Sequence, residues 1–324
     1  MCGYRFPWPL LALLIAAGLS PALAPQASQP PPAGWKLVWS DEFDGKEIDR
    51  TKWDFDIGNG FFNYDANTWI SGWGNAELQY YTREAENAFV KDGMLHLRAV
   101  KESLHGCGYT SARLKTRKRD GSPLFSQKYG RFEFRAKLPT GKGVWPALWL
   151  LPQGDKYGTW AASGEIDVVE AKGQDPAKVL GTLHYGSRWP HNTHTSKTYD
   201  FPPGGSIADF HVYVLEWEPG KISWSVDGKV YATQTFWWSS SKLDRGKGAK
   251  PSQASDLNAW PAPFDQPFYL VMNVAVGGKF VGNPDQTTTF PVEMVVDYVR
   301  VYDKVGGYGA APPRGEGKLP FGKP

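Results

Sequence analysis

Alternation of apolar and polar residues dominates the chain and predicts strands rather than helices. In an extended chain successive side chains point to opposite faces, so one face can be apolar while the other meets solvent. Helical periodicity is nearly absent, and Asp227-Gly228 joins two alternating segments as a two-residue hairpin turn. The pattern therefore predicts an all-β fold of two stacked antiparallel sheets. The clearest predicted strands are residues 94–100, 130–138, 211–217, 221–226, 229–232, 268–276 and 292–302.

Three long segments rich in Gly, Pro, Ser and Trp interrupt the strands, at residues 57–76, 186–207 and 236–266. Loops of that length in a compact domain are usually functional. We expect them to wall a groove that is open to a substrate. The tryptophans expected on its rim are Trp73, Trp237 and Trp238.

The two ends of the chain differ in composition from the body. A basic start, an apolar stretch and an Ala-x-Ala site ending at Ala24 predict a signal peptide at residues 1–24. Residues 25–33 are predicted to be a flexible lead, and residues 304–324, with repeated Gly and Pro, a disordered tail. One domain is expected between them, at residues 34–303. The mature protein is then secreted, to the extracellular space or the periplasm, with no membrane anchor.

Charge and composition narrow the class of partner. The formal charge is +3, and the basic excess lies in the leader and the tail, so the body is close to neutral. Nucleic-acid binding needs a concentrated basic face and is not expected. Aromatic residues make up 15% of the chain, with 15 Trp. Because sugar rings stack their C–H faces on indole, this composition favours a carbohydrate ligand, although a Trp-rich core would give the same count.

The segment Glu165-Ile166-Asp167-Val168-Val169-Glu170 places three carboxylates in an apolar, β-branched run. Strict alternation would put Glu165 and Asp167 on one face and Glu170 on the other. A β-bulge inserts one residue and reverses the parity, and bulges are common beside active sites. We therefore predict a bulge at Val168-Val169 that returns Glu170 to the face of Glu165. The alternative is an edge strand with solvent-facing acids.

Two carboxylates on one face suit glycoside hydrolysis, in which one acts at the sugar carbon and the other protonates the leaving oxygen. A retaining enzyme places the carboxyl groups about 5–5.5 Å apart and an inverting one about 6.5–9.5 Å apart, so the sequence does not choose between them. Asp167 lies between the two glutamates. Its like charge should help to keep Glu170 protonated at working pH.

Several blocks resemble one known family in their order along the chain. They are Trp39-Ser40-Asp41-Glu42-Phe43, residues 75–82, Tyr109-Thr110-Ser111-Ala112-Arg113, residues 143–152, residues 181–185 and Ala275-Val276-Gly277-Gly278. The chain resembles glycoside hydrolase family 16, and within it the laminarinase-like endo-β-1,3-glucanases. The resemblance implies a β-jelly-roll sandwich with an open substrate cleft, and net retention of anomeric configuration. The five-residue spacing of the two glutamates resembles the laminarinase-like form rather than the lichenases or the xyloglucan transglycosylases.

By position, the resemblance implies that Glu165 is the nucleophile, Glu170 the general acid/base and Asp167 their electrostatic helper. Further positions resemble substrate contacts of the family: stacking aromatics, polar groups on the glycone side and one residue near the leaving sugar. A core position is the alternative for both strand tryptophans and for the histidine. These substrate-binding candidates are Trp145, Trp149 and Trp160, then Asn75, Glu77 and Arg113, and finally His184.

No cofactor is expected for catalysis. The resemblance also implies a structural calcium ion away from the site, with the matching positions Glu42, the carbonyl of Gly93 and Asp297. Oxygen ligands suit a hard cation. The alternative is that Glu42 and Asp297 are ordinary surface acids.

The resulting hypothesis is a secreted, monomeric endo-β-1,3-glucanase whose partner is β-glucan, with mixed β-1,3/1,4-glucan as a further substrate. Two alternatives stay open. One is a non-catalytic β-glucan recognition protein, although such relatives typically lose the catalytic acids. The other is a galactan hydrolase of the agarase or carrageenase type, which often needs basic residues for sulfate groups; no obvious basic cluster lies near the acidic motif.

Overall fold

A computed structural model describes residues 30–321. The signal peptide predicted at residues 1–24, and most of the lead at residues 25–33, lie outside these residues. The described chain is built from strands and two short 3-10 helices, η1 (Gly72–Gly74) and η2 (Ala254–Asp256). None of its helices is long and apolar enough to cross a membrane.

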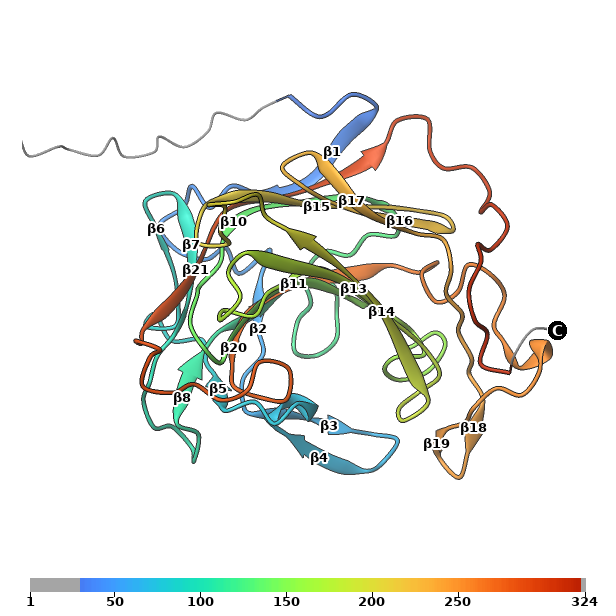
Figure 1. Ribbon diagram of the computed structural model, residues 1–324, viewed down its shortest axis with the longest axis horizontal. Coiled ribbons are helices and arrows are strands. Elements are labelled where there is room, and N and C mark those ends of the chain that lie inside the picture. The colour runs from blue at the N-terminus through green and yellow to red at the C-terminus, as the bar shows by residue number, and fades with distance from the viewer. Residues whose placement is uncertain (1–29, 322–324) are drawn as a thin grey trace, which may run out of the picture. The chain divides into compact units, whose positions relative to one another are not determined.

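Two large sheets lie face to face (Figure 1) and confirm the predicted all-β sandwich. The eight-stranded sheet contains, in spatial order, β17 (Lys229–Gln234), β16 (Lys221–Val226), β15 (His211–Glu218), β10 (Gly130–Lys137), β21 (Val292–Lys304), β7 (Met94–Ala99) and β6 (Ala88–Lys91), with β1 (Trp35–Asp41) also paired to β21. The seven-stranded sheet contains β14 (Asn192–Asp200), β13 (Lys178–Gly186), β12 (Glu165–Glu170), β11 (Val144–Pro152), β20 (Phe268–Val276), β9 (Arg113–Lys115) and β2 (Asp54–Phe55).

Three smaller pairs of strands stand beside the two sheets. Two are antiparallel hairpins and the third is a parallel pair. The strands are β3 (Gly60–Asn63) with β4 (Thr68–Ser71), β18 (Leu243–Asp244) with β19 (Lys247–Gly248), and β5 (Gln79–Tyr81) with β8 (Tyr109–Ser111).

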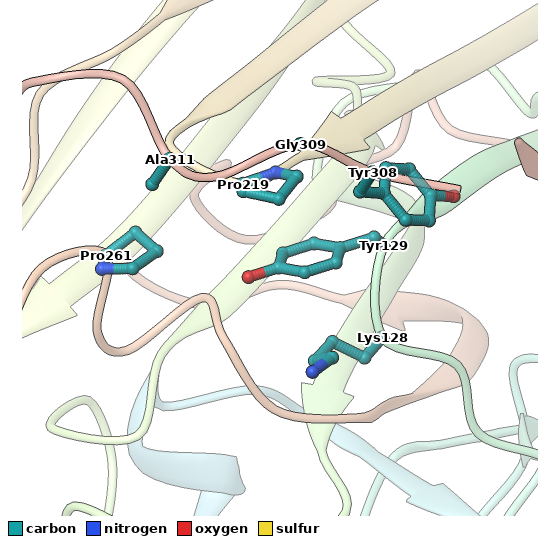
Figure 2. A pocket seen from close by; sticks show the side chains of 7 residues that line it. All are labelled: Lys128, Tyr129, Pro219, Pro261, Tyr308, Gly309 and Ala311. Carbon is teal, nitrogen blue, oxygen red and sulfur yellow. The ribbon is translucent and has the colours of Figure 1, made fainter. Parts of the chain in front are cut away.

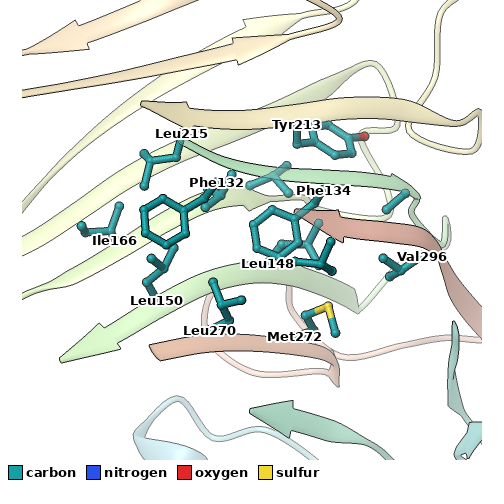
Figure 3. Packing of buried hydrophobic residues seen from close by; sticks show 14 of the residues in the cluster. Phe132, Phe134, Leu148, Leu150, Ile166, Tyr213, Leu215, Leu270, Met272 and Val296 are labelled. Carbon is teal, nitrogen blue, oxygen red and sulfur yellow. The ribbon is translucent and has the colours of Figure 1, made fainter. Parts of the chain in front are cut away.

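The core fills the space between the two large sheets (Figure 3). Phe132 and Phe134 of β10 pack from one side, and Leu148 and Leu150 of β11 from the other, all fully buried. The polar members of the same alternation, such as Arg131, point away from this core and form ion pairs. The face of the seven-stranded sheet that points away from the core is therefore free to carry polar and aromatic side chains.

The predicted hairpin at Asp227-Gly228 is confirmed. Val226 pairs with Lys229, which leaves a two-residue turn. Asp227 and Gly228 both have positive φ, at 49° and 78°. This is the backbone conformation that Asp-Gly adopts at low cost in such turns.

The loop predicted at residues 186–207 is wrong in part, because β14 occupies Asn192–Asp200. This strand lies at the edge of the seven-stranded sheet, and most of its side chains are exposed or half-buried. Its sequence, rich in Thr, Ser, His and Lys, has no apolar face. An edge strand of this kind gives no alternating hydrophobic signal, so only its pairing with β13 reveals it.

The rim position predicted for Trp237 and Trp238 is also wrong. Their side chains are 0% and 5% exposed, and both belong to the core. Trp237 Nε1 donates to the carbonyl oxygen of Pro261 at 2.9 Å, and its ring packs on Trp260. The Gly- and Pro-rich composition of this loop hides an aromatic cluster, because composition does not report which way a side chain turns.

The disorder predicted for residues 304–324 is wrong for the part that the structure describes. Gly315 N donates to Thr235 O at 2.8 Å, and Trp260 Nε1 donates to Pro312 O at 2.7 Å. The guanidinium of Arg314 lies over the Trp260 ring. The tail has no core of its own, but the finished domain offers it hydrogen-bond partners and an aromatic surface, which a composition argument does not see.

A small pocket separates the first part of the tail from the domain. Figure 2 shows Tyr308 and Ala311 of the tail on one side of this pocket, with Tyr129 and Pro261 facing them. Tyr308 and Tyr129 also contact each other through their rings. The tail is thus held at both its beginning and its middle.

Candidate active site

The predicted bulge in β12 is confirmed. Asp167 pairs with Thr182 of β13 and Glu170 with Leu180, so three steps along β12 match two steps along β13. On the other side, Leu148 pairs with Val169 and Trp149 with Asp167, which leaves Val168 as the extra residue. Ile166, Val168 and Val169 are all buried in the core. Because the consecutive residues Val168 and Val169 both face the core, Glu170 returns to the face that carries Glu165 and Asp167.

The three acids consequently share the face of the seven-stranded sheet that points away from the core, which we call the site face. The position of His184, which pairs with Glu165 across the sheet, shows this arrangement. Its Nε2 atom lies 3.5 Å from Glu165 Oε1 and 3.5 Å from Asp167 Oδ2. A core position was the alternative for His184, and the structure places its ring against the acids instead.

Glu170 is held from two neighbouring strands. Trp145 Nε1, from β11, donates to Glu170 Oε1 at 3.1 Å. Thr182 Oγ1, from β13, donates to Glu170 Oε2 at 3.2 Å. Glu165 is held from the loop before β12, because Trp160 Nε1 donates to Glu165 Oε2 at 3.0 Å. Each glutamate therefore has an indole partner that fixes its carboxyl group.

Burial raises the pKa of all three acids. The pKa of Glu165 rises to about 7, mainly through burial, while the hydrogen bond from Trp160 opposes the shift. The pKa of Asp167 rises well above its usual range because of burial, then because of the charges of Glu170 and Glu165. Burial also raises the pKa of Glu170. One face thus holds a carboxyl group that ionises near neutrality, Glu165, beside Asp167, which retains its proton there, and Glu170, whose pKa is also raised. Carboxyl groups whose environments shift their pKa values by different amounts are suited to acid/base catalysis.

His184 has the opposite shift. Burial lowers the pKa of its imidazole to about 4, so the ring is neutral at neutral pH. It therefore offers no positive charge to the acids. Its neighbours are aromatic on both sides, the Trp160 ring and the His194 ring.

Glu77 anchors the polar side of the site, next to the 3-10 helix η1. Asn75 Nδ2 and Gln79 Nε2 donate to its two carboxyl oxygens, at 3.1 Å and 2.7 Å. The backbone of Glu77 forms a bridge with Gly277 at the end of β20, which attaches this loop to the seven-stranded sheet. A pocket adjoins Glu77, and Trp69 and Lys279 also line it.

Arg113 is held between two tryptophans. Its guanidinium lies 4.5 Å from the ring centroid of Trp73 and 4.6 Å from that of Trp149. Arg113 Nε lies 3.0 Å from Asp56 Oδ2, so the charge has a half-buried counter-ion. The rim position expected for Trp73 is thus a contact with the site itself, and Trp145 and Trp149 are both half-buried on the site face rather than in the core.

Further residues, which were not among the candidates predicted from the sequence, support these side chains. Asn273 accepts a hydrogen bond from Trp149 Nε1 at 2.8 Å and donates to Tyr81 Oη at 3.0 Å. Asn273 is a polar residue in the otherwise apolar strand β20, which was a usable signal. Thr182, between Gly181 and Leu183 of β13, was a similar signal. Asp56 and Gln79 carried none, because each has an acidic residue two positions before it.

The β3–β4 hairpin, within the predicted loop 57–76, reaches the far side of the site. Asp65 at its tip accepts a hydrogen bond from Thr159 and from Arg188 Nη1. Thr159 directly precedes Trp160, the indole that holds Glu165. The hairpin tip therefore stabilises the loop that orients the first acid.

The predicted calcium ligands do not fit a cation site. Glu42 receives two hydrogen bonds from Arg300, at 2.9 Å and 2.7 Å, and Asp297 Oδ2 accepts one from Arg135 at 2.6 Å. Both carboxylates are thus neutralised by arginine. Gly93 lies in the turn between β6 and β7 with φ of 71°. The positive φ of this turn explains why the residue is a glycine.

Known proteins resemble this chain over most of its length. The profile of Glycosyl hydrolases family 16 matches residues 79–266. Glucan endo-1,3-beta-glucosidase A1 of Niallia circulans is 46% identical over 286 residues, which is 85% of this chain but 39% of that protein. Beta-glucanase of Rhodothermus marinus is 43% identical over 279 residues, 83% of this chain and 85% of that protein.

A solved structure shares the fold. The laminarinase catalytic domain from Thermotoga maritima MSB8 superposes with a TM-score of 0.66 at 41% identity, and the match covers 83% of this chain and 98% of that one. The profile, the sequence relatives and the shared architecture agree, and the bulged acidic strand lies within the matched region. The chain belongs to glycosyl hydrolases family 16.

Proposed function

We propose that this protein is a retaining endo-β-1,3-glucanase of the laminarinase type, secreted and monomeric, that also accepts mixed β-1,3/1,4-glucan. The observation that carries this proposal is the bulge in β12, because it brings Glu165, Asp167 and Glu170 to one face with a separate indole on each glutamate. Residues 34–303 are the proposed catalytic domain. The relatives named for glucan hydrolysis supply the substrate class.

In the first step Glu165 attacks the anomeric carbon and Glu170 gives its proton to the glycosidic oxygen, so the leaving chain departs as an alcohol. In the second step Glu170, now ionised, takes a proton from a water molecule whose oxygen attacks the same carbon and releases Glu165. Asp167, which keeps its proton, can donate a hydrogen bond to Glu165. No cofactor takes part. The proposal contains no calcium ion, because the two carboxylates of the predicted calcium site, Glu42 and Asp297, are paired with arginines.

The substrate lies along the site face in this proposal. Trp145, Trp149 and Trp160 offer indole surfaces beside the acids, where sugar rings can stack. The polar group of Asn75, Glu77 and Arg113 receives the glycone side, and His184 lies beside the leaving sugar. Each of these side chains is fixed by a neighbour, so little conformational entropy is lost on binding.

The test is product analysis on laminarin, curdlan, lichenan and agarose, with proton NMR of the first product formed. We expect short oligosaccharides from laminarin and curdlan, fewer from lichenan, none from agarose, and the β-anomer first. Products from agarose alone would favour the galactan hydrolase. Binding of laminarin with no new reducing ends would favour the recognition protein, which the presence of all three acids disfavours.

The Trp160 indole should set the acid limb of the pH profile. Its hydrogen bond lowers the pKa of Glu165, although burial still raises that pKa to about 7. In Trp160→Phe the pKa of Glu165 should rise further. As the pH is lowered, kcat/KM should therefore begin to fall at a higher pH than in the wild type. The exposed neighbour Trp189 is the matched control, and Trp189→Phe should leave the limb in place. If the acid limb does not shift in Trp160→Phe, ionisation of Glu165 does not cause that limb.

The parity of β12 can be tested by changing its length. Deleting Val168 leaves a regular strand in which Glu165, Asp167 and Glu170 still share one face, because Asp167 and Glu170 would then match Thr182 and Leu180 without an extra residue. Deleting both Val168 and Val169 leaves Glu170 three positions after Glu165, so alternation turns it toward the core. We expect the single deletion to retain measurable laminarin hydrolysis and the double deletion to lose at least about 10²-fold in kcat. Circular dichroism checks that both fold, and a folded double-deletion variant with full activity would contradict the bulge argument.

A further inference from the structure

We infer that Glu165, Asp167 and His184 form a binding site for one divalent transition-metal ion of the Zn²⁺ class, and that this ion competes with the glucan. The geometry is the first reason. One donor atom from each residue lies within 4.8 Å of the other two. His184 Nε2 lies 3.5 Å from the Glu165 oxygen and 3.5 Å from the Asp167 oxygen. Two ligand atoms on a tetrahedral Zn²⁺ are about 3.4 Å apart, given bond lengths of about 2.0–2.2 Å.

The second reason is a buried polar atom without a partner. Asp167 Oδ2 has no hydrogen-bond partner among residues 30–321, and the Asp167 side chain is 5% exposed. Such an atom is costly, and this one faces the imidazole nitrogen. A metal ion bound there takes the place of the proton that Asp167 otherwise keeps. The two glutamate oxygens are divided as a metal site needs, because Trp160 occupies Glu165 Oε2 and leaves Oε1 toward His184.

The donor set selects the class of ion. One imidazole with two carboxylates suits Zn²⁺ or a similar borderline ion, whereas Ca²⁺ and Mg²⁺ prefer six or more oxygen ligands. Three protein ligands leave the fourth position open, as in sites that exchange water or substrate. Since all three ligands lie on the site face, the open position of the ion is on that face too, where the glucan is proposed to lie.

The consequence rests on the proposed function. Glu165 Oε1 cannot attack a sugar carbon while its lone pair is bound to a metal ion. A bound ion should therefore raise the apparent KM for laminarin and leave kcat unchanged once the glucan displaces it. The ion is an inhibitor in this proposal and takes no part in the reaction.

Binding is tested without activity, by isothermal titration calorimetry and equilibrium dialysis of the full chain with ZnCl₂. We expect one Zn²⁺ per chain, no binding of MgCl₂ or CaCl₂ at the same concentrations, and affinity at least about tenfold weaker in His184→Gln. The matched control is His191→Gln, since His191 is exposed and should leave the affinity unchanged.

A second arm locates the ion. Laminarin oligosaccharides should lower the apparent affinity for Zn²⁺ in the wild type, and Glu165→Gln should weaken it as His184→Gln does. Equal Zn²⁺ affinity in the wild type and in both variants would overturn the proposal, as would Zn²⁺ binding that saturating oligosaccharide does not affect when the oligosaccharide itself binds. If laminarin is neither bound nor cut, the proposed function fails, and the calorimetry with the variants still decides the metal site.

Discussion

Replacing Glu165 by Gln is expected to lower kcat for laminarin by at least about 10⁴-fold, with little change in folding. The amide keeps the size of the side chain and can still accept the hydrogen bond from Trp160, but it is not a nucleophile. The measurement is the release of reducing ends under single-turnover conditions, with oligosaccharide affinity determined separately by calorimetry. A folded variant that binds and cuts laminarin near the wild-type rate would remove Glu165 from the nucleophile position.

The same variant has a stability readout that is independent of substrate. The pKa of Glu165 rises from 4.5 to about 7 on folding, so the folded protein keeps a proton that the unfolded chain loses. This contribution to stability is present below pH 4.5 and is lost as the pH rises through about 7. Between pH 4.5 and pH 8, Glu165→Gln should therefore gain about 3 kcal/mol of unfolding free energy relative to the wild type. Denaturant unfolding of both proteins at the two pH values measures it.

Replacing Glu170 by Gln is the second large effect, an expected loss of about 10²–10⁴-fold in kcat on laminarin. The amide cannot protonate the leaving oxygen or activate water. On an aryl glucoside whose leaving group needs no proton, formation of the glycosyl-enzyme should stay fast and its hydrolysis should become slow. A burst of aryl alcohol followed by a slow steady state is the signature, and the basic limb of the pH profile should disappear.

Azide distinguishes the two glutamates by stereochemistry. With Glu170→Ala, azide attacks the glycosyl-enzyme in place of water, so a β-glycosyl azide forms. With Glu165→Ala, azide attacks the substrate directly and an α-glycosyl azide forms, provided that the substrate carries a good leaving group. The reversed pair of products would exchange the two assignments, and no azide product from either variant would contradict a retaining mechanism.

The local sequence pattern was sufficient to predict those features that depend only on neighbouring residues in the chain. Asp227-Gly228 forms its turn because both residues tolerate positive φ. The parity problem of Glu165 and Glu170 has one simple solution in a strand, and the bulge at Val168 is that solution. Alternation along residues 130–138 locates a strand because one of its faces must be apolar in a sandwich. Residues 268–276 form a continuous apolar run, which indicates a strand that is buried throughout.

Other features depended on partners that are distant in sequence. Strand β14 has no apolar face, and it exists because β13 offers it a ladder of hydrogen bonds. Trp237 lies in the core because Pro261 and Trp260 surround it, and the tail beyond Lys304 is ordered because Trp260 and Thr235 give it hydrogen-bond partners. No local pattern carries this information, since the same residues in another fold would be exposed.

The sequence by itself determined the strand-rich architecture, the acidic strand with its bulge, and the family to which the chain belongs. Only the tertiary structure decided which neighbours hold each acid, that burial raises the pKa of Glu165 to about 7, and that His184 faces two carboxylates. The physical reason is that parity along a strand is a local property of the backbone. Burial, hydrogen-bond partners and electrostatic fields are instead sums over residues that the fold brings together.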